Sequence, residues 1–313
     1  MTAAHTAGSI QAAIDLGTNT ILMVTGRRLR DGSMEVLDDA HEIARLGKGV
    51  DEARQISADA MDRVCRLLCQ YRQRAEELGA TRVRAFGTSA LRDAANKTDL
   101  IRAAADQAGI QLVELSGTDE ARQTFSGAIF GLNLQSSRYA VIDIGGGSTE
   151  LALGKRGDVE QFQSVDVGAV RVTERFFPDL PPTAEQQRQA VLMIRQTLDE
   201  LFEFPTDLQL VGVAGTVTTL AAIASGVERF DMRELDGYEL SLAAVRELTQ
   251  QLVQMSPAEI SALPQVNDQR ADIIGAGSLI LRTFLQSHSL TSVTVSTRGI
   301  RYGLLSDMLS GRL

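Results

Sequence analysis

The sequence predicts an α/β fold made of two similar domains, and two observations carry this prediction. First, segments with strand character alternate with segments of helical periodicity along the 313 residues. Second, one motif occurs once in each half of the chain, at Ile14–Thr20 and at Ile142–Thr149. Each copy is an apolar strand, an aspartate between aliphatic residues, glycine, and hydroxyl residues that enter a second strand. Such a repeat indicates a duplicated domain.

The first half opens with strands and continues with alternating helices and strands. Asp31-Gly32 is a turn signal between the second and third strands. An apolar stripe from Met61 to Leu78 predicts a helix that starts at Ser57 and ends at Gly79. The predicted strands are Ile10–Leu16, Ile21–Arg28, Met34–Ile43, Val83–Phe86 and Gln111–Leu115, and two further helices are expected at Asp99–Ala108 and Asp119–Ile129.

A polar, turn-prone segment, Asn133–Arg138, separates the two halves. The boundary is therefore expected near 131–137, giving domains 1–133 and 134–313, with the last helix able to pack back on the first domain. From Tyr139 the order of strand, glycine turn and two strands begins again. Helices follow at 168–177, 183–203, 216–225, 241–253 and 268–287, with strands at 208–213 and 291–295.

Composition excludes several classes of function. The formal charge is −9, tryptophan is absent and aromatic residues make up 4%, which argues against nucleic-acid binding. No apolar run reaches the roughly 20 residues that a membrane span needs, and residues 1–9 lack a secretory apolar region. A cytoplasmic location without membrane partners is expected. Cys65 and Cys69 share one helix face and are interpreted as structural thiols.

The repeated motif has the chemistry of a phosphate-binding hairpin. Its aspartate can hold Mg²⁺ or the water ligands of Mg²⁺, its glycines allow backbone N–H groups to approach phosphate oxygens, and its hydroxyls add donors. One such hairpin is often only a strand turn, whereas two that face each other across a cleft could hold a polyphosphate. The first copy contributes Asp15, Gly17, Thr18, Asn19 and Thr20, and the second contributes Asp143, Gly145, Gly146, Gly147, Ser148 and Thr149.

The second copy, extended to Glu150, closely resembles the signature of the exopolyphosphatase / guanosine pentaphosphate phosphohydrolase (Ppx/GppA) family. Further segments similar to that family lie in order along the chain, at 45–49, 87–96, 115–122, 214–219, 270–274 and 296–301. The resemblance implies two duplicated actin-like (ribonuclease-H-like) domains with a cleft between them. It also implies phosphoanhydride hydrolysis, dependence on Mg²⁺ or Mn²⁺, and a homodimer.

Residue roles combine this resemblance with the needs of phosphoryl transfer to water. Glu120 is expected to be the base that activates water, because it matches the family's catalytic glutamate. Asp119 departs from the Glu-Glu pair of relatives, which leaves open which of the two acids is the base. Asp143, Glu150 and Asp15 are expected to be metal ligands, and Glu150 is also assigned a catalytic role.

Three further regions are expected to contact phosphate. Arg92 is the predicted clamp, because a guanidinium can hold two phosphate oxygens at once. Gly215 and Thr216 follow a strand and open a helix, so their N–H groups suit an anion. Lys48 and Arg298 are expected as outer contacts of a long polyanion.

The leading hypothesis is an exopolyphosphatase that releases orthophosphate from the end of inorganic polyphosphate through a Glu-activated water. Conversion of guanosine pentaphosphate to tetraphosphate is the alternative within the same chemistry. An actin-like ATP-binding kinase or chaperone is less favoured, because Gly-Gly-Gly-Ser-Thr-Glu and Glu120 suggest that water is the acceptor. A non-catalytic sensor of these phosphates is the third possibility, although all candidate carboxylates are present.

Overall fold

A computed structural model of the chain describes residues 8–48, 50–132, 136, 138–155, 158–202, 205, 208–228 and 232–313. The chain divides into two compact units, unit 1 (residues 1–123 and 300–313) and unit 2 (residues 124–299). The predicted boundary at residues 133 and 134 lies outside the described residues. The division itself falls inside a helix, and the C-terminal segment returns to unit 1, where it packs on the first two strands.

Unit 1 is built on a five-stranded mixed sheet with the order β3-β2-β1-β4-β5. β1, β2 and β3 pair antiparallel, whereas β4 and β5 extend the sheet in parallel from β1. Its strands are β1 Gln11–Leu16, β2 Thr20–Arg28, β3 Met34–Ile43, β4 Arg82–Gly87 and β5 Gln111–Glu114. Its helices are α1 Val50–Ala53, α2 Ala58–Glu77, α3 Ser89–Asp93, α4 Lys97–Ala108, the first half of α5 Gly117–Ala128, and α13 Ile300–Leu309.

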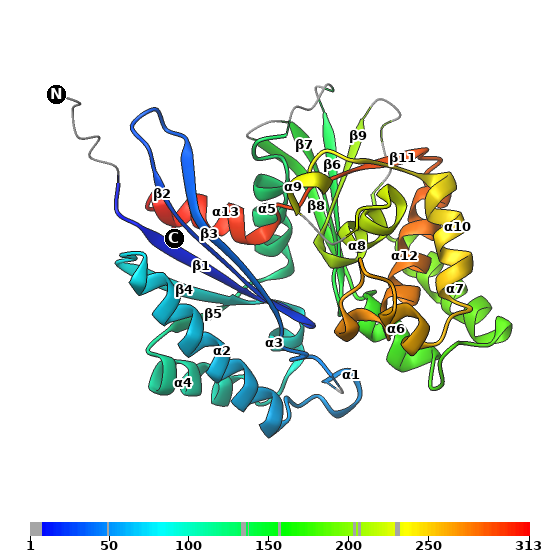
Figure 1. The fold of residues 1–313 in the computed structure, drawn as a ribbon, viewed down its shortest axis with the longest axis horizontal. Helices are drawn as coiled ribbons and strands as arrows, with labels where there is room; N and C mark the ends of the chain where they lie inside the picture. Colours follow the sequence, from blue (N-terminus) through cyan, green and yellow to red (C-terminus); the bar gives the residue numbers. More distant parts are fainter. Residues whose placement is uncertain are drawn as a thin grey trace. The chain divides into compact units, whose positions relative to one another are not determined.

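Helices cover both faces of the unit 1 sheet (Figure 1). Alternate residues of β1, namely Ala12, Ile14 and Leu16, join the apolar core under α2 and α4. α13 packs against β1 and β2 on the opposite face. Both faces of β1 are therefore buried, which explains why almost every residue of this strand is inaccessible to solvent.

Unit 2 repeats this sheet and adds one strand, in the order β10-β11-β9-β6-β7-β8. β6, β7 and β8 pair antiparallel, and β9 and β11 continue in parallel. Its strands are β6 Tyr139–Ile144, β7 Thr149–Lys155, β8 Asp158–Val165, β9 Gln209–Val213, β10 Glu239–Ser241 and β11 Ser292–Val295. Its helices are α6 Ala169–Phe176, α7 Ala184–Leu198, α8 Ala214–Ser225, α9 Met232–Leu235, α10 Leu242–Leu252, α11 Pro257–Ser261, the 3₁₀ helix η1 Asp268–Arg270, and α12 Ile274–Ser287.

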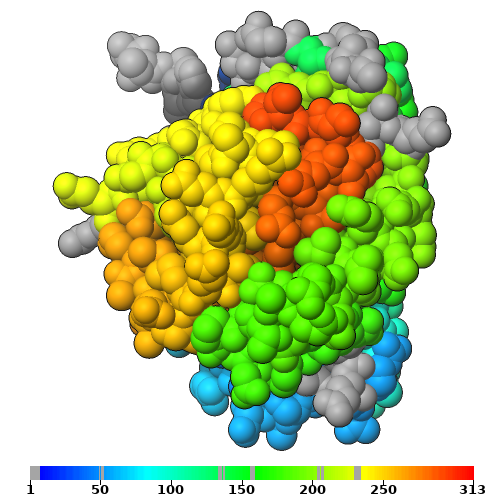
Figure 2. Space-filling view, turned by 90° about the vertical axis from the view of Figure 1, so that its right-hand side faces the viewer, coloured from blue at the N-terminus to red at the C-terminus, as the bar shows by residue number. Residues whose placement is uncertain are grey.

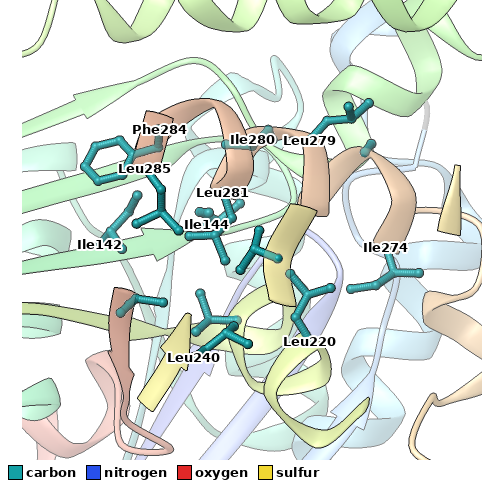
Figure 3. Packing of buried hydrophobic residues seen from close by; sticks show 14 of the residues in the cluster. Ile142, Ile144, Leu220, Leu240, Ile274, Leu279, Ile280, Leu281, Phe284 and Leu285 are labelled. Carbon is teal, nitrogen blue, oxygen red and sulfur yellow. The ribbon is translucent and has the colours of Figure 1, made fainter. Parts of the chain in front are cut away.

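The main core of unit 2 lies between the sheet and α12. Phe284 and Leu285 of α12 pack close to Ile142 and Ile144 of β6 (Figure 3). α12 contacts α10 and α7, and the three helices lie side by side on one face of the unit (Figure 2). The other sheet face is covered by the last part of α5, where Phe125 joins a second apolar cluster.

The two sheets confirm the predicted α/β fold and its duplication. The strand order 3-2-1-4-5 of unit 1 recurs in unit 2 as β8-β7-β6-β9-β11, with the same parallel and antiparallel pairings. β10 is the only strand among the described residues that lacks an equivalent in unit 1. Gly17 N–H donates to the Thr20 carbonyl at 2.9 Å, and Gly145 N–H donates to the Ser148 carbonyl at 3.0 Å. The two hairpins thus close in the same way.

The structure corrects two of the expected helices. The helix predicted at 268–287 is divided into η1 and α12, because Asn267 caps a single 3₁₀ turn and α12 begins only at Ile274. The helix predicted at 183–203 ends at Leu198 within the described residues, since Asp199 is its C-cap. In the part of the chain that the structure describes, no helix is both long and apolar enough to cross a membrane.

Candidate active site

The unit 1 hairpin joins β1 to β2 through Gly17, Thr18 and Asn19, and two other predicted segments pack on it. The N–H groups of Ala44 and Arg45 donate to the Asn19 carbonyl, and that of Gly47 donates to the Thr18 carbonyl at 2.8 Å. A Cβ at Gly47 would lie 2.2 Å from the Thr18 methyl group, so this close approach requires glycine. The segment at 45–48 therefore supports the hairpin from one side.

The segment that follows β4 supports the same hairpin from a second side. Thr18 Oγ1 and Ser89 Oγ are hydrogen-bonded at 2.8 Å, and Thr88 N–H donates to the Leu16 carbonyl at 3.2 Å. Thr18 and Asn19 are both buried, and the Asn19 Nδ2 group has no hydrogen-bond partner among the described residues. Asn19 therefore brings a buried amide donor to the hairpin, as its predicted phosphate-binding role requires.

Asp15 is less accessible than the sequence suggests. It is only 7% exposed and stands within β1, opposite Leu22 and beside Phe86, rather than beyond the end of the strand. The cause is α13, which packs on β1 and brings Arg301 close enough for the charge of Asp15 to act on it. Burial alone would lower the pKa of Arg301, but Asp39 and Asp15 outweigh it and raise this pKa.

Glu120 and Arg92 come together in unit 1. Arg92, on α3, donates from Nη1 to Glu120 Oε2 at 2.5 Å and to the Leu115 carbonyl at 3.2 Å. Glu120 lies in the first turn of α5 and is 8% exposed. A carboxylate this buried is retained in its charged form when a guanidinium neutralises it. The predicted base and the predicted phosphate clamp are thus direct partners.

The local structure also separates Glu120 from its neighbour Asp119. Asp119 accepts a hydrogen bond from Ser116 Oγ at 2.7 Å, and its N–H donates back to that hydroxyl at 3.1 Å. Its side chain is 50% exposed and lies 3.8 Å from Arg122. Asp119 therefore serves the start of α5, as acidic residues commonly do. Glu120, by contrast, is shielded from solvent, which favours it over Asp119 as the base.

The unit 2 hairpin is held in place by hydrogen bonds to the carbonyl groups of its glycines. The N–H groups at the start of α6 donate to the carbonyls of Gly145 and Gly146 at 2.8–3.1 Å, and Arg171 Nε donates to the Gly147 carbonyl at 2.7 Å. A Cβ at Gly168 would lie 2.4 Å from the Gly146 carbonyl oxygen, so α6 can approach the loop only through a glycine. Because three carbonyls are occupied, backbone N–H groups are the loop's groups suited to an anion.

Asp143 and Glu150 form a pair of neighbouring carboxylates. They stand directly opposite each other in the β6–β7 ladder, so both side chains lie on the same sheet face. Glu150 is 2% exposed and accepts a hydrogen bond from Ser164 Oγ at 2.6 Å, and Asp143 is partly exposed. Within the described residues, no three His, Cys, Asp or Glu side chains form a metal-binding group. Two carboxylates completed by water and phosphate oxygens nevertheless suit Mg²⁺.

Two predicted phosphate-binding hydroxyls are used inside the fold. Thr149 is fully buried and donates to the Val167 carbonyl at 2.6 Å, while Thr216 donates to the Ile144 carbonyl at 3.2 Å. These hydroxyls hold the loop segments in place. Their backbone N–H groups stay the candidates for phosphate binding. Ala214, which opens α8, has φ +64°, a conformation that costs non-glycine residues free energy and often marks a functional loop.

Several residues of the site were missed by sequence reasoning. Arg270 lies directly over Gly215, since a Cβ there would be 1.6 Å from Arg270 Nη1. Its burial lowers the pKa of Arg270 to about 10, and an anion beside it would offset this. Arg171 is buried against the glycine loop. A lone arginine on the apolar face of residues 169–172 was the available signal for it.

The outer contacts predicted for a polyanion differ from one another. Lys48 is exposed next to the unit 1 hairpin. Arg298 instead donates to the Phe130 carbonyl at 2.6 Å, pairs with Asp236 at 3.3 Å and lies over the Phe130 ring. Arg298 therefore has a structural role within unit 2. Each unit assembles its own predicted residues, and the facing of the two hairpins stays a prediction.

Comparison with known proteins agrees with this arrangement. Residues 27–311 match the Ppx/GppA phosphatase family. The chain is 33% identical over 308 residues to exopolyphosphatase 2 of Mycobacterium tuberculosis, covering 94% of this chain and 96% of that protein. It is 30% identical to the guanosine-5'-triphosphate,3'-diphosphate pyrophosphatase of Vibrio cholerae, covering 96% of this chain but 59% of that protein.

Solved structures of similar fold include members of the same family. A crystal structure of an exopolyphosphatase-like protein superposes with a TM-score of 0.90 at 28% identity, covering 96% of this chain and 97% of that one. The Ppx/GppA protein of Aquifex aeolicus superposes with a TM-score of 0.82 at 27% identity, covering 97% of this chain and 98% of that one. Because the family match covers residues 27–311, including the unit 2 hairpin, and the Mycobacterium tuberculosis relative is 33% identical and covered over 96% of its length, the chain belongs to the Ppx/GppA phosphatase family.

Proposed function

We propose that this chain is an exopolyphosphatase, a phosphoanhydride hydrolase that releases orthophosphate from the end of inorganic polyphosphate. The observation that carries the chemistry is the buried Glu120 carboxylate held by Arg92 at 2.5 Å. Polyphosphate is favoured because exopolyphosphatase 2 of Mycobacterium tuberculosis is matched over 96% of its length. The pyrophosphatase of Vibrio cholerae is matched over only 59% of its length.

In the proposed reaction a water oxygen attacks the terminal phosphorus, and the bond from this phosphorus to the bridging oxygen breaks. The bridging oxygen leaves with the shortened chain, and Glu120 accepts a proton from the attacking water. Arg92 would hold the terminal phosphate beside Glu120. Backbone N–H groups of the two glycine turns would bind the following phosphates. The products are orthophosphate and a chain shorter by one unit.

Asp143 and Glu150 are proposed to hold Mg²⁺, or Mn²⁺ in its place, and Asp15 would contribute from the other hairpin. The fit rests on the adjacency of two hard oxygen ligands in the β6–β7 ladder. When bound, the ion would neutralise phosphate charge that develops during transfer. The hydrogen bond from Ser164 fixes the orientation of Glu150 for this role.

The test is phosphate release from polyphosphates of defined length and from guanosine pentaphosphate, with Mg²⁺ present and then chelated. We expect faster release from polyphosphate and loss of activity on chelation. Glu120→Gln should lower kcat by about 10²–10⁴-fold, the usual contribution of a general base. Asp119→Asn, its matched control, should keep near wild-type turnover. Equal losses in both variants would remove the role proposed for Glu120.

Hydrolysis of guanosine pentaphosphate is the second candidate, favoured by the 30% identity to the Vibrio cholerae enzyme. A higher kcat/KM for that nucleotide than for any polyphosphate would make it the main function. We also propose that the enzyme acts as a homodimer in the cytoplasm. Light scattering after size-exclusion chromatography tests the dimer, and a monomer at working concentrations would contradict it.

A further inference from the structure

An arginine reaches the surface of unit 2 through an otherwise buried helix. Every residue of α12 from Ala276 to Leu285 is buried except Arg282. α12 lies between α10 and α7, which flank it on the outer face of the unit (Figure 2). Its other side packs in the core with Leu281 and Phe284 (Figure 3). The guanidinium of Arg282 therefore emerges in the gap between neighbouring helices.

Arg246 of α10 lies next to this opening. Thr249 Oγ1 of α10 donates to the Ser278 carbonyl of α12 at 3.2 Å, and Leu242 N–H donates to the Thr291 carbonyl. The two helices therefore run antiparallel. Arg246 precedes Thr249 by three residues and Arg282 follows Ser278 by four, so both lie about one helical turn from this contact in the same direction.

The two cations are not neutralised by the part of the chain that the structure describes. Neither Arg246 nor Arg282 forms an ion pair with a described residue, and the buried Nε of Arg282 has no hydrogen-bond partner there. Burial lowers the pKa of Arg282, and the like charge of Arg246 lowers it further. Arg301, which is more deeply buried, is paired with the carboxylate of Asp39.

Two guanidinium groups close enough for one charge to act on the other, and without a carboxylate partner, form a receptor for an oxyanion. Each guanidinium can donate two N–H groups to phosphate oxygens, and an anion between them would remove both the repulsion and the unsatisfied donor. The net charge of −9 makes such a local positive site stand out on this protein. Phosphate groups joined in a chain match two adjacent cations better than one orthophosphate.

We propose that Arg246 and Arg282 form an accessory binding site for oligophosphate groups on the outer surface of unit 2. The site is separate from the glycine hairpin of this unit. The N-terminal end of α12 touches the hairpin region, since Gly277 packs on Thr216, and Arg282 is five residues, or about 7.5 Å of helix, further along. Inorganic oligophosphate and the phosphate tail of a nucleotide share this chemistry.

The experiment follows the Nε–H signal of Arg282 by ¹⁵N NMR of the whole protein while imidodiphosphate is added. This probe carries a P–N–P bridge in place of the P–O–P bond, so the readout is independent of hydrolysis. Arg282→Gln assigns the signal by removing it. We expect a saturable shift in the wild type, and an affinity about tenfold weaker or worse in Arg246→Gln.

Arg66→Gln is the matched control, because Arg66 is an exposed helical arginine of unit 1 that forms no ion pair with a described residue. It should leave the shift unchanged. Parallel titrations with orthophosphate and with guanosine 5'-(β,γ-imido)triphosphate separate the sources: equal binding of both oligophosphates indicates that only the phosphates are recognised. The proposal is overturned if the signal does not move, or if Arg246→Gln binds as tightly as Arg66→Gln.

Discussion

Replacement of Arg301 by methionine tests how the C-terminal helix is anchored to unit 1. Arg301 is 5% exposed and donates two hydrogen bonds of 2.9 Å to the carboxylate of Asp39. Tyr302 adds a third hydrogen bond to Asp39 at 2.7 Å. Methionine can fill much of the space of the arginine stem, but it leaves the Asp39 carboxylate without its counter-charge.

The magnitude follows from these contacts. Two hydrogen bonds between charged groups are worth about 1.5–3 kcal/mol each. Asp39 keeps the Tyr302 hydroxyl and has a side chain that is 16% exposed, so water recovers part of the loss. We therefore expect Arg301→Met to lower the free energy of unfolding by about 3 kcal/mol, near the lower end of the range for a broken buried pair.

The assay is urea unfolding followed by circular dichroism, with Arg312→Met as the control. Arg312 pairs with Asp307 near the same chain end, but its side chain is 63% exposed, and its loss should cost less than about 1 kcal/mol. The double variant Arg301→Met/Asp39→Leu should recover much of the stability, because it removes the unpaired charge. Equal effects of Arg301→Met and Arg312→Met would refute the reasoning.

Three further predictions concern the hairpins. Gly168→Ala should cost about 1–3 kcal/mol of stability and lower turnover, because its methyl group would displace the Gly146 loop; thermal unfolding and phosphate release measure the two effects. Glu150→Gln should raise the Mg²⁺ concentration for half-maximal activity by about tenfold or more, as a metal titration would reveal. Because burial lowers the folded-state pKa of Arg270 to about 10, the cost of its charge is present in full below pH 10 and diminishes as pH rises above it. Arg270→Met should therefore raise the ligand-free melting temperature at pH 7.5 and reduce the extra stabilisation by added tripolyphosphate.

Strand and helix periodicity predicted most of the fold because burial imposes it directly. The strands of the unit 1 hairpin and the long amphipathic α2 agree with the expected bounds to within one or two residues, and β6 begins at Tyr139, where the second set of strands was expected. α13 was expected only as a last helix without bounds, and its sequence carries Gly303 in the middle of the helix. That glycine is required by packing, since a Cβ there would lie 2.1 Å from the Gln123 carbonyl of α5. Gly303 lowers the local helix propensity of α13, but it allows the close contact between α13 and α5.

The candidate site was predictable where the motif itself carries the chemistry. The glycines and Asp143 could be named from the motif's pattern, whereas the role given to Glu150 also drew on the family resemblance. The Arg92–Glu120 pair could not be derived that way, because it joins residues 28 positions apart on two helices. Arg270 and Ser164 likewise reach the loops from separate elements. The hydroxyls of Thr149 and Thr216 serve backbone carbonyls, an outcome that depends on tertiary packing.

The two copies of the duplicated hairpin have diverged in a way that indicates a division of roles. In unit 2 the aspartate faces a second acid, Asp143 opposite Glu150, whereas in unit 1 the same position pairs Asp15 with Leu22. A leucine cannot ligate a metal, so by its own residues only the unit 2 ladder offers two adjacent carboxylates. Unit 1 instead contributes the buried acid Glu120 and its partner Arg92. If this division is correct, Leu22→Glu should not create a second Mg²⁺ site, because α13 packs on β1 and β2 and Asp15 is only 7% exposed. Isothermal titration with Mg²⁺ would show unchanged stoichiometry, and an additional equivalent of bound metal would contradict the assignment.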